Sequence, residues 1–377
     1  MRLQRIHLVA AARPNFMKVA PLYHALSREH WCQPLIVHTG QHYDANMSDD
    51  FFRDLRLPQP DFHLDVGSGT HAEQTGKVMI SYEQVAVENR PDWIVVVGDV
   101  NSTAACSLVA AKQCIPLAHL EAGLRSRDRR MPEEINRVVT DALADVLWTP
   151  SADADENLRA EGVAADRIEC IGNIMIDSFE MLRADIEADR TAEQLGLPRH
   201  RYVLVTLHRP SNVDSRSLLS ELCASISAAA RLLPMVFVVH PRTRKRLREF
   251  DLEDGLLRQG MALLEPLGYV QFMNLLQGAA AIITDSGGVQ EESTYLNIPC
   301  LTVRENTERP ITIAMGSNRL VTAAAIEREL LQSLEAPVRL ASRRPPLWDG
   351  HAADRAVASL RRRCRVARLD NVGRAVS

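Results

Sequence analysis

Short apolar runs alternate with longer segments of helical period along most of the chain, and this alternation limits the possible folds more than any other feature. In the first half the runs cover Ile6–Ala11, Pro34–Val37, Trp93–Val97, Ile115–Leu120, Val146–Trp148 and Ile168–Ile171. Helical segments such as Gln74–Glu88, Ser102–Lys112 and Glu133–Leu143 separate them. Strands that are apolar throughout are buried on both faces, which is typical of a parallel sheet covered by helices. The first half therefore predicts an α/β domain.

The same pattern starts again near residue 200. Its strand candidates are Tyr202–Thr206, Met235–His240, Met261–Leu264, Ala280–Thr284 and Cys300–Val303, with helical segments at Ser217–Leu232 and Tyr269–Gln277. A chain of 377 residues is also long for one domain. We predict an α/β protein with two Rossmann-like parallel-sheet domains that face each other across a cleft. The expected limits are 1–175 and 176–355, and a helix over 356–377 is expected to cross back to the first domain.

Composition excludes several classes of function. The chain is 46% hydrophobic and 24% charged, and its net charge of −4 favours neither nucleic acid nor an anionic membrane as a partner. Seven cysteines lie scattered without CxxC spacing, which is typical of a reduced protein and predicts no metal site. The N-terminus lacks the apolar core of a signal peptide, and no apolar run approaches the ~18 residues of a membrane span. We expect a cytoplasmic protein.

Polar residues follow the predicted strands of the first half, at the sheet edge where open parallel sheets bind ligands. They are Arg13, Lys18, Asp99 and Glu121, joined by Glu133 at a predicted helix start. Carboxylates that cluster in a partly closed site can act as general acid or base. The plainer alternatives are solvated loops and, for Glu133, complementation of the helix dipole.

The second half carries a different set of polar residues, centred on the sequence TDSGGVQEE at 284–292. Gly287 and Gly288 allow a sharp turn between a strand and a helix, where bare N–H groups and the helix dipole favour a phosphate or diphosphate. Other candidates to bind such an anion or its sugar are Ser286, Glu292, His208, His240, Arg304 and Arg309. The alternatives are an ordinary strand–turn–helix connection with surface glutamates, and a structural histidine at 208.

Two common nucleotide motifs are missing from the sequence. No GxGxxG follows the first predicted strand, and GxxxxGK[ST] does not occur. Nicotinamide-dependent redox chemistry and P-loop hydrolysis are therefore not expected.

The order of ten segments resembles that of the UDP-N-acetylglucosamine 2-epimerases, which have the two-domain GT-B fold. The resemblance runs from about residue 4 to about residue 365. The segments are ARPNFMKVAPL, TGQHYD, VVVGDVNST, HLEAGLRS, PEEINR, IGNIMID, TLHRPSNVD, VVHP, TDSGGVQEE and RENTERP. Asn15 departs from the family, which usually has an acidic residue there, and Pro210 and Ser211 replace its usual Arg and Glu.

The resemblance implies a reaction at C2 of a UDP-2-acetamido sugar. UDP leaves C1 while a proton leaves C2, and UDP adds back to the 2-acetamidoglucal with the proton delivered to the opposite face. By that likeness Asp99, Glu121 and Glu133 are the acid/base carboxylates, and His208 lies near the departing diphosphate. The likeness also assigns the diphosphate to Arg13, Lys18, Ser286, Gly287 and Gly288, the ribose to Glu292, and further nucleotide and sugar contacts to His240, Arg304 and Arg309. No cofactor is implied, and a homodimer is expected.

Other hypotheses stay open at this point. The substrate could be a more decorated UDP sugar, such as UDP-2,3-diacetamido-2,3-dideoxyglucuronate. Water could attack the intermediate, as in the hydrolysing branch of the family. A GT-B glycosyltransferase would need an acceptor site and no set of acid/base carboxylates. A non-catalytic UDP-sugar sensor would be expected to lack one of Asp99, Glu121 and Glu133, and all three are present.

Overall fold

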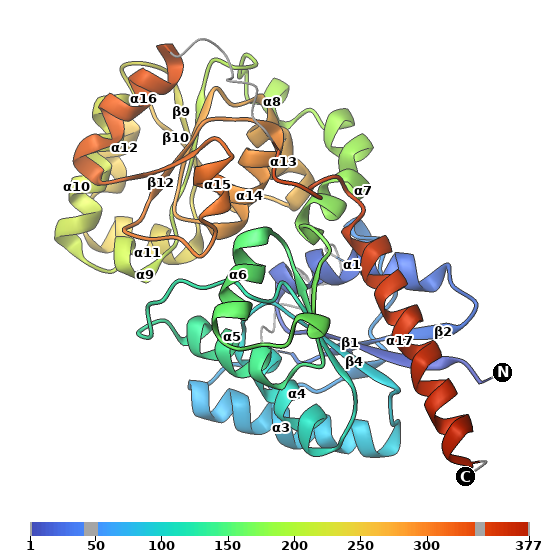
Figure 1. Ribbon diagram of the computed structural model, residues 1–377. Coiled ribbons are helices and arrows are strands. Elements are labelled where there is room, and N and C mark those ends of the chain that lie inside the picture. Colours follow the sequence, from blue (N-terminus) through green and yellow to red (C-terminus); the bar gives the residue numbers. More distant parts are fainter. Residues whose placement is uncertain (1, 41–51, 336–343, 376–377) are drawn as a thin grey trace. The chain divides into compact units, whose positions relative to one another are not determined.

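The computed structural model describes residues 2–40, 52–335 and 344–375 (Figure 1). It divides into two compact units, one formed by Met1–Met181 with Pro346–Ser377 and the other by Leu182–Pro345. Helix α7 (Ile174–Ala188) contains the point where the chain passes from the first unit to the second. The sequence prediction assigns 346–355 to the second domain, whereas these residues belong to the first unit.

The first unit contains a seven-stranded parallel sheet with the order β3-β2-β1-β4-β5-β6-β7. Its strands are β1 (Gln4–Ala10), β2 (Cys32–His38), β3 (Phe62–His63), β4 (Trp93–Val97), β5 (Leu117–Leu120), β6 (Val146–Thr149) and β7 (Ile168–Cys170). Its other helices are α1 (Arg13–Ser27), α3 (His71–Glu88), α4 (Asn101–Lys112), α5 (Pro132–Leu143), α6 (Ala152–Ala160), η1 (Ala165–Arg167) and α17 (Ala352–Ala375). The all-apolar sequence of β4, WIVVV, is buried at every position because helices cover both faces of the sheet.

One core of the first unit lies between the sheet and helices α3 and α4. Helix α3 contributes Val78, Tyr82 and Ala86, and α4 contributes small side chains that include Ala105 and Cys106. The sequence of α4 is compatible with either a dimer contact or a core helix. Nine of its twelve residues are buried within this unit, so it is a core helix.

Helix α17 returns the end of the chain to the first unit, where it packs against α1 (Figure 1). The carboxylate of Asp177, on α7, accepts the backbone N–H groups of Ala352 (3.2 Å) and Ala353 (2.7 Å) at the start of α17. This is a helix cap supplied from another element. Burial raises the pKa of Asp177 to about 6, although the two N–H groups oppose that shift.

The second unit contains a six-stranded parallel sheet with the order β10-β9-β8-β11-β12-β13. Its strands are β8 (Val203–Thr206), β9 (Met235–Val238), β10 (Ala262–Leu264), β11 (Ala281–Thr284), β12 (Cys300–Val303) and β13 (Asn318–Val321). Its helices are α8 (Thr191–Gln194), α9 (Pro210–Val213), α10 (Arg216–Ala229), α11 (Pro241–Glu249), α12 (Glu253–Arg258), α13 (Tyr269–Gly278), α14 (Gly287–Leu296), α15 (Ile311–Ala314), η2 (Ala323–Ala325) and α16 (Ile326–Glu335).

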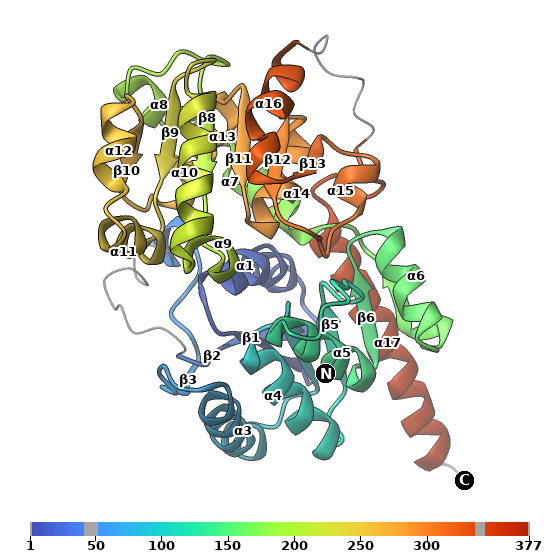
Figure 2. The same cartoon turned by 90° about the vertical axis from the view of Figure 1, so that its left-hand side faces the viewer.

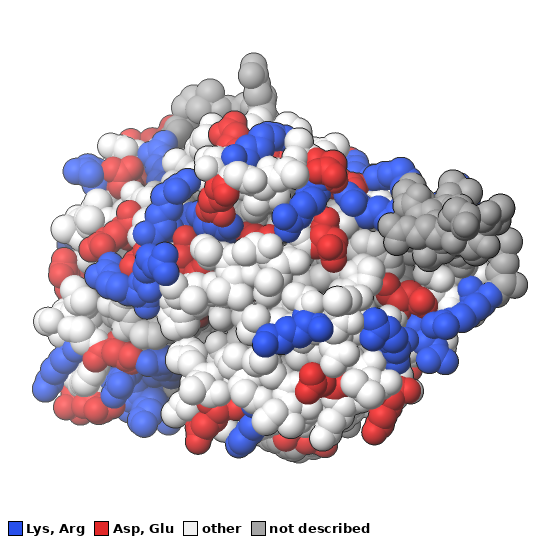
Figure 3. All heavy atoms as spheres, turned by 60° about the horizontal axis from the view of Figure 1, so that its bottom comes forward, with Lys and Arg blue, Asp and Glu red and all other residues white. Residues whose placement is uncertain are grey.

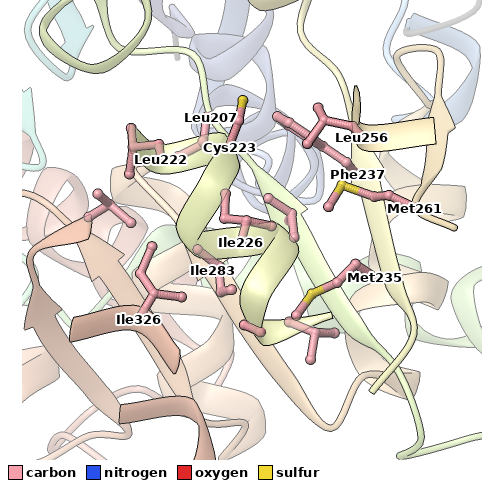
Figure 4. Close-up of a cluster of buried hydrophobic side chains, with 14 of the residues drawn as sticks. Leu207, Leu222, Cys223, Ile226, Met235, Phe237, Leu256, Met261, Ile283 and Ile326 are labelled. Carbon is pink, nitrogen blue, oxygen red and sulfur yellow. The ribbon is translucent and has the colours of Figure 1, made fainter. Parts of the chain in front are cut away.

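Helices lie on both faces of this second sheet (Figure 2). On one face, α10 places Leu222, Cys223 and Ile226 against strand residues such as Phe237 and Ile283 (Figure 4). These three α10 side chains recur at three- and four-residue spacing, so a single face of the helix meets the sheet. The core thus forms where the helical and strand periods of the sequence both place apolar side chains inward.

On the face shown in Figure 3, lysines and arginines are interspersed with aspartates and glutamates, so neither sign of charge dominates it. Among the helices of residues 2–40, 52–335 and 344–375, none combines the length and apolar character that a membrane span needs.

Candidate active site

Lys18 and Glu121 form a buried ion pair in the first unit. Lys18 projects from α1, Glu121 directly follows β5, and the Lys18 ammonium donates to Glu121 Oε2. Only 11% of the Lys18 side chain and 8% of the Glu121 side chain are exposed. The backbone at Glu121 has φ +73°, which non-glycine residues rarely adopt and which costs about 1–3 kcal/mol. Such strain is concentrated at functional sites, so it supports a role for this carboxylate.

Asp99 follows the neighbouring strand β4 and is paired with Arg137 of α5. Arg137 donates to Asp99 Oδ2 from Nη2 at 2.7 Å and from Nε at 3.0 Å. The Asp99 backbone carbonyl accepts a hydrogen bond from Asn136 Nδ2 at 2.9 Å. Because 31% of the Asp99 side chain is exposed, this carboxylate is oriented and yet accessible to a ligand.

Gly98 brings the two carboxylate pairs together. A Cβ built at Gly98 would lie 3.3 Å from Glu121 Oε2 and 3.4 Å from Lys18 Nζ, and the glycine has φ +66°. A side chain at this position would therefore meet both unfavourable backbone geometry and the ion pair. The turn that carries Asp99 thus packs directly on Lys18 and Glu121. We call Asp99, Arg137, Lys18 and Glu121 the carboxylate site.

Asn15 has a structural reason to be an amide in this chain. Its Oδ1 accepts the Ala12 N–H at 3.1 Å, and its Nδ2 donates to the Val97 carbonyl at 3.2 Å. An ionised carboxylate could accept the first bond but could not donate the second. The departure from the acidic residue usual in the family therefore ties the start of α1 to the end of β4.

The adjacent glutamates of α5 have different environments. Glu133 is exposed, whereas Glu134 is buried and accepts bonds from the N–H groups of Ser126 (2.9 Å) and Arg127 (2.8 Å). Arg137 Nη1 also donates to Glu134 at 2.6 Å. Burial alone would raise the pKa of Glu134, but the backbone N–H groups and Arg137 hold it below the ordinary value. Glu134 is thus a fixed structural carboxylate.

The structure does not describe every residue that the sequence suggests for this site. Arg13 begins α1, and its side chain lies outside the described residues. Residues 41–44 of the TGQHYD segment also lie outside them. Arg137 was not predicted from the sequence, although its three-residue spacing from Glu134 is a helical signal that the two side chains share a face.

In the second unit, three arginines surround the buried carboxylate of Glu308. Its oxygens lie 2.5 Å from Arg309 Nη1, 2.6 Å from Arg304 Nη2 and 3.4 Å from Arg209 Nη2. Arg309 Nε is also 2.9 Å from Glu291 Oε1. Burial would raise the pKa of Glu308, but Arg309 and Arg304 hold it far below the usual range. We call these five residues the arginine cluster; with three cations and two carboxylates, its net charge favours an anion.

The glycine turn contacts the arginine cluster. A Cβ built at Gly287 would lie 2.5 Å from Arg309 Nη1 and 3.0 Å from Glu308 Oε1, whereas one at Gly288 would meet nothing within 4 Å. Ser286 precedes α14, and the first N–H groups of that helix have no partner in the preceding turn of helix. The positive end of α14 and the arginines therefore lie together, which is suitable for binding a phosphate group.

His208 and His240 lie next to each other near Asp285, with ring centroids 5.7 Å apart. Asp285 is wholly buried and lies 2.9 Å from His208 Nδ1, and it also accepts the N–H groups of His208 and Arg209 at 3.0 Å. Burial would raise the pKa of Asp285, but His208 and the donated hydrogen bonds lower it. Burial and the neighbouring His208 lower the pKa of His240. Asp285, which the sequence analysis missed, thus fixes the orientation of His208.

Glu292 lies on α14 in the second unit and is buried, as is the preceding Glu291. Burial, together with the negative charge of Glu291, raises the pKa of Glu292 to about 8. At neutral pH this carboxyl therefore holds a proton and can donate a hydrogen bond as well as accept one. The sequence pattern alone does not distinguish the environments of the two glutamates, whereas in the structure Glu291 belongs to the arginine cluster.

Comparisons with known proteins agree on one family. A family model described as UDP-N-acetylglucosamine 2-epimerase matches residues 24–361. The chain is 42% identical over 331 residues to the UDP-N-acetylglucosamine 2-epimerase of Methanocaldococcus jannaschii. The match covers 84% of this chain and 88% of that protein. It is 39% identical to the UDP-2,3-diacetamido-2,3-dideoxy-D-glucuronate 2-epimerase of Pseudomonas aeruginosa, and this match covers 85% of this chain and 89% of that protein.

Solved structures give the same result. The crystal structure of the M. jannaschii UDP-GlcNAc 2-epimerase with UDP-GlcNAc and UDP matches with a TM-score of 0.87 and 39% identity, over 94% of this chain and 99% of that one. The UDP-GlcNAc 2-epimerase of Neisseria meningitidis bound to UDP-GlcNAc matches with a TM-score of 0.87 and 27% identity, over 95% and 100%. The predicted GT-B fold, with two parallel-sheet α/β domains, is confirmed.

Proposed function

Since the chain belongs to the UDP-N-acetylglucosamine 2-epimerase family, we propose that it is a non-hydrolysing 2-epimerase that interconverts UDP-N-acetylglucosamine and UDP-N-acetylmannosamine. The observation that carries the proposal is the carboxylate site, where Asp99 and Glu121 follow neighbouring strands and Gly98, next to Asp99, packs against Glu121. An epimerase needs acid/base groups for both faces of one carbon. Two separately oriented carboxylates meet that requirement.

The chemistry proceeds by elimination because the C2 proton has no adjacent carbonyl to acidify it. A carboxylate takes this proton, the electrons of the C2–H bond form the C1=C2 double bond, and the C1–O bond breaks with its electron pair leaving on UDP. UDP then adds back to C1 while C2 receives a proton on the opposite face. Asp99 and Glu121 are the proposed groups that exchange these protons. Glu133, exposed on α5, is the proposed third acid/base residue.

The negative charge that develops on UDP is stabilised by cations and N–H groups, which is commonly the largest electrostatic contribution to such a step. In the proposed assignment Ser286, Gly287, Gly288, Arg304 and Arg309 bind UDP together with His240. The contact of the Gly287 turn with the arginine cluster supports this role. By the family likeness we also assign Arg13, Lys18 and His208 to the diphosphate, and Glu292 to the ribose hydroxyls.

A proton NMR time course with UDP-N-acetylglucosamine in D2O tests the function directly. Deuterium at C2 together with a growing UDP-N-acetylmannosamine signal is the expected result. Free N-acetylmannosamine with UDP would instead identify a hydrolysing enzyme. Tight UDP binding with no change at C2 would contradict the proposal and direct the search to another UDP sugar or to glycosyl transfer.

A second candidate substrate is UDP-2,3-diacetamido-2,3-dideoxyglucuronate, because the Pseudomonas relative that carries this name is 39% identical over 85% of the chain. The same NMR experiment with each sugar separates the two by their rates of C2 exchange. A homodimer and a cytoplasmic location stay predictions, and a role in the synthesis of surface polysaccharide precursors is part of the proposal. Measurement of the molar mass in solution tests the first of them.

A further inference from the structure

His119 is a fully buried histidine whose two ring nitrogens both contact hydrogen-bond acceptors. It lies on β5 with none of its surface exposed. Nδ1 is 2.6 Å from Asp141 Oδ1, and Nε2 is 2.8 Å from the Gly98 carbonyl oxygen. A carbonyl oxygen cannot donate, and the Asp141 carboxylate also lies 2.7 Å from the Arg125 guanidinium. Both nitrogens of His119 therefore face acceptors, and the imidazolium is the one form of the ring that can donate to both.

The charges around this imidazolium compensate one another. Asp141 lies on α5 and is also buried, Arg125 pairs with it, and Arg125 in turn lies 2.7 Å from Glu161. With His119 protonated, two cations and two carboxylates alternate from His119 to Glu161. Burial alone would raise the pKa of Asp141, but His119 and Arg125 lower it. Pairing and hydrogen bonding of this kind are what make a buried charge tolerable.

His119 and Asp141 both form hydrogen bonds with the backbone of the carboxylate site. The His119 N–H holds the carbonyl of Gly98, the residue directly before Asp99. Asp141 holds His119 and also accepts the Gly123 N–H at 3.1 Å, so its contacts lie on both sides of Glu121 in the sequence. Glu121 is the residue with φ +73°. His119 and Asp141 therefore fix both the Gly98–Asp99 turn and the unusual backbone at Glu121.

We propose that His119, held as an imidazolium by Asp141, is a positioning residue that sets the relative placement of Asp99 and Glu121. This inference rests on the proposed function, in which those two carboxylates exchange the C2 proton. His119 has no exposed surface, so it acts on the site through the Gly98 carbonyl. Its loss would displace one carboxylate relative to the other, and a displacement on the order of 1 Å can cost about 100-fold in rate.

The matched control is His7, which lies on β1 of the same sheet and is also fully buried. Its Nδ1 is 3.2 Å from the Tyr82 hydroxyl, and burial, with a smaller effect of Arg5, lowers its pKa to about 4. His7 is therefore expected to be neutral, whereas the proposal makes His119 charged. A variant at either position removes a buried histidine from the same unit. A role in folding alone predicts similar effects for the two variants.

His119→Gln and His7→Gln are compared for kcat, KM and the ratio of C2 deuterium exchange to net epimerisation. We expect H119Q to lower kcat about 100-fold with KM little changed, and to raise that ratio because proton removal and delivery no longer use correctly placed groups. H7Q should lower stability but leave the ratio at the wild-type value. Equal ratios in H119Q, H7Q and wild type would overturn the positioning role.

The protonation of the resting protein supplies a second test that needs no turnover. In protein labelled with 15N-histidine, His119 should show two N–H groups and His7 at most one, at neutral pH. Asp141→Asn should remove one N–H signal of His119; a singly protonated His119 in wild type would overturn the inference. Wild-type protein without C2 exchange on either UDP sugar would refute the proposed function instead, so the two failures are distinguishable.

Discussion

Arg137 donates two N–H groups to the same carboxylate oxygen of Asp99, from Nη2 at 2.7 Å and from Nε at 3.0 Å. Its third nitrogen donates to Glu134, which in turn holds the N–H groups of Ser126 and Arg127. Asp99 therefore has a fixed orientation relative to α5, although it follows β4. This relationship adds a buried cation of α5 to the site for which the sequence predicts Asp99, Glu121 and Glu133 as the acid/base carboxylates.

Substitution of Asp99 by Asn should remove C2 exchange and leave UDP binding intact. An amide cannot act as a base, and the loss of a general acid or base costs typically 10²–10⁴-fold. Turnover is measured by NMR in D2O and UDP affinity by calorimetry. Asp92→Asn is the control, because Asp92 precedes the same strand at its opposite end and accepts the Arg5 N–H at 2.8 Å. Normal turnover in D99N would rule out its assigned role.

Removal of one partner from the Lys18–Glu121 pair should be strongly destabilising. Lys18→Met leaves a buried carboxylate without its ammonium, and breaking a buried pair in this way costs about 3–5 kcal/mol. The double variant Lys18→Met/Glu121→Leu should recover part of that loss, because no charge is then left buried. Urea unfolding measures the free energy of unfolding of the wild type, the single variant and the double variant. Arg28→Met, which breaks the exposed pair with Asp354, should have little effect.

A methyl group at Gly287 should weaken UDP binding. Its Cβ would lie 2.5 Å from Arg309 Nη1, so the guanidinium must move out of the arginine cluster. We expect at least a 10-fold loss of UDP affinity in Gly287→Ala, measured by calorimetry. Gly255→Ala, in α12 of the same unit, adds a methyl group with no atom within 4 Å and should bind UDP normally. Equal affinities in the two variants would contradict the placement of the diphosphate at this turn.

Glu292 should make stability fall as pH rises. Its pKa is about 8 in the folded protein and has an ordinary value of 4.5, so the folded state retains a proton that the unfolded state releases. The contribution is fully present below about pH 4.5 and is lost as pH rises through 8. Glu292→Gln cannot titrate and should flatten this dependence in urea unfolding between these pH values. The exposed Glu305→Gln is the control, and an unchanged slope in E292Q would count against a neutral Glu292.

The same residue has a separate role in the proposed function. Glu292→Ala should weaken UDP binding, because the ribose hydroxyls lose a buried hydrogen-bonding group. The affinity of the variant for UDP is compared with its affinity for inorganic diphosphate, which lacks both uracil and ribose. A loss confined to UDP is expected, since diphosphate has no ribose. Unchanged UDP affinity would refute the assignment.

Much of the fold could be predicted from the sequence because buried parallel strands are apolar along their whole length. Trp93–Val97 and Cys300–Val303 are predicted with the bounds that β4 and β12 have in the structure. The edge strands β3 (Phe62–His63) and β13 (Asn318–Val321) were missed. β3 has two residues, and β13 contains polar side chains because an edge strand is only partly buried. Neither has a continuous apolar run that marks it as a strand.

The sequence by itself determined which residue types follow each strand: Asp99 and Glu121 in the first unit, and Ser286, Gly287 and Gly288 in the second. That follows from local chemistry, since strand period and glycine turns are encoded over a few residues. Only the tertiary structure decided the partners: Arg137 for Asp99, Lys18 for Glu121, Asp285 for His208. Each partner lies on a different part of the chain from the residue with which it pairs. Such pairing depends on which elements pack together, so no local pattern contains it.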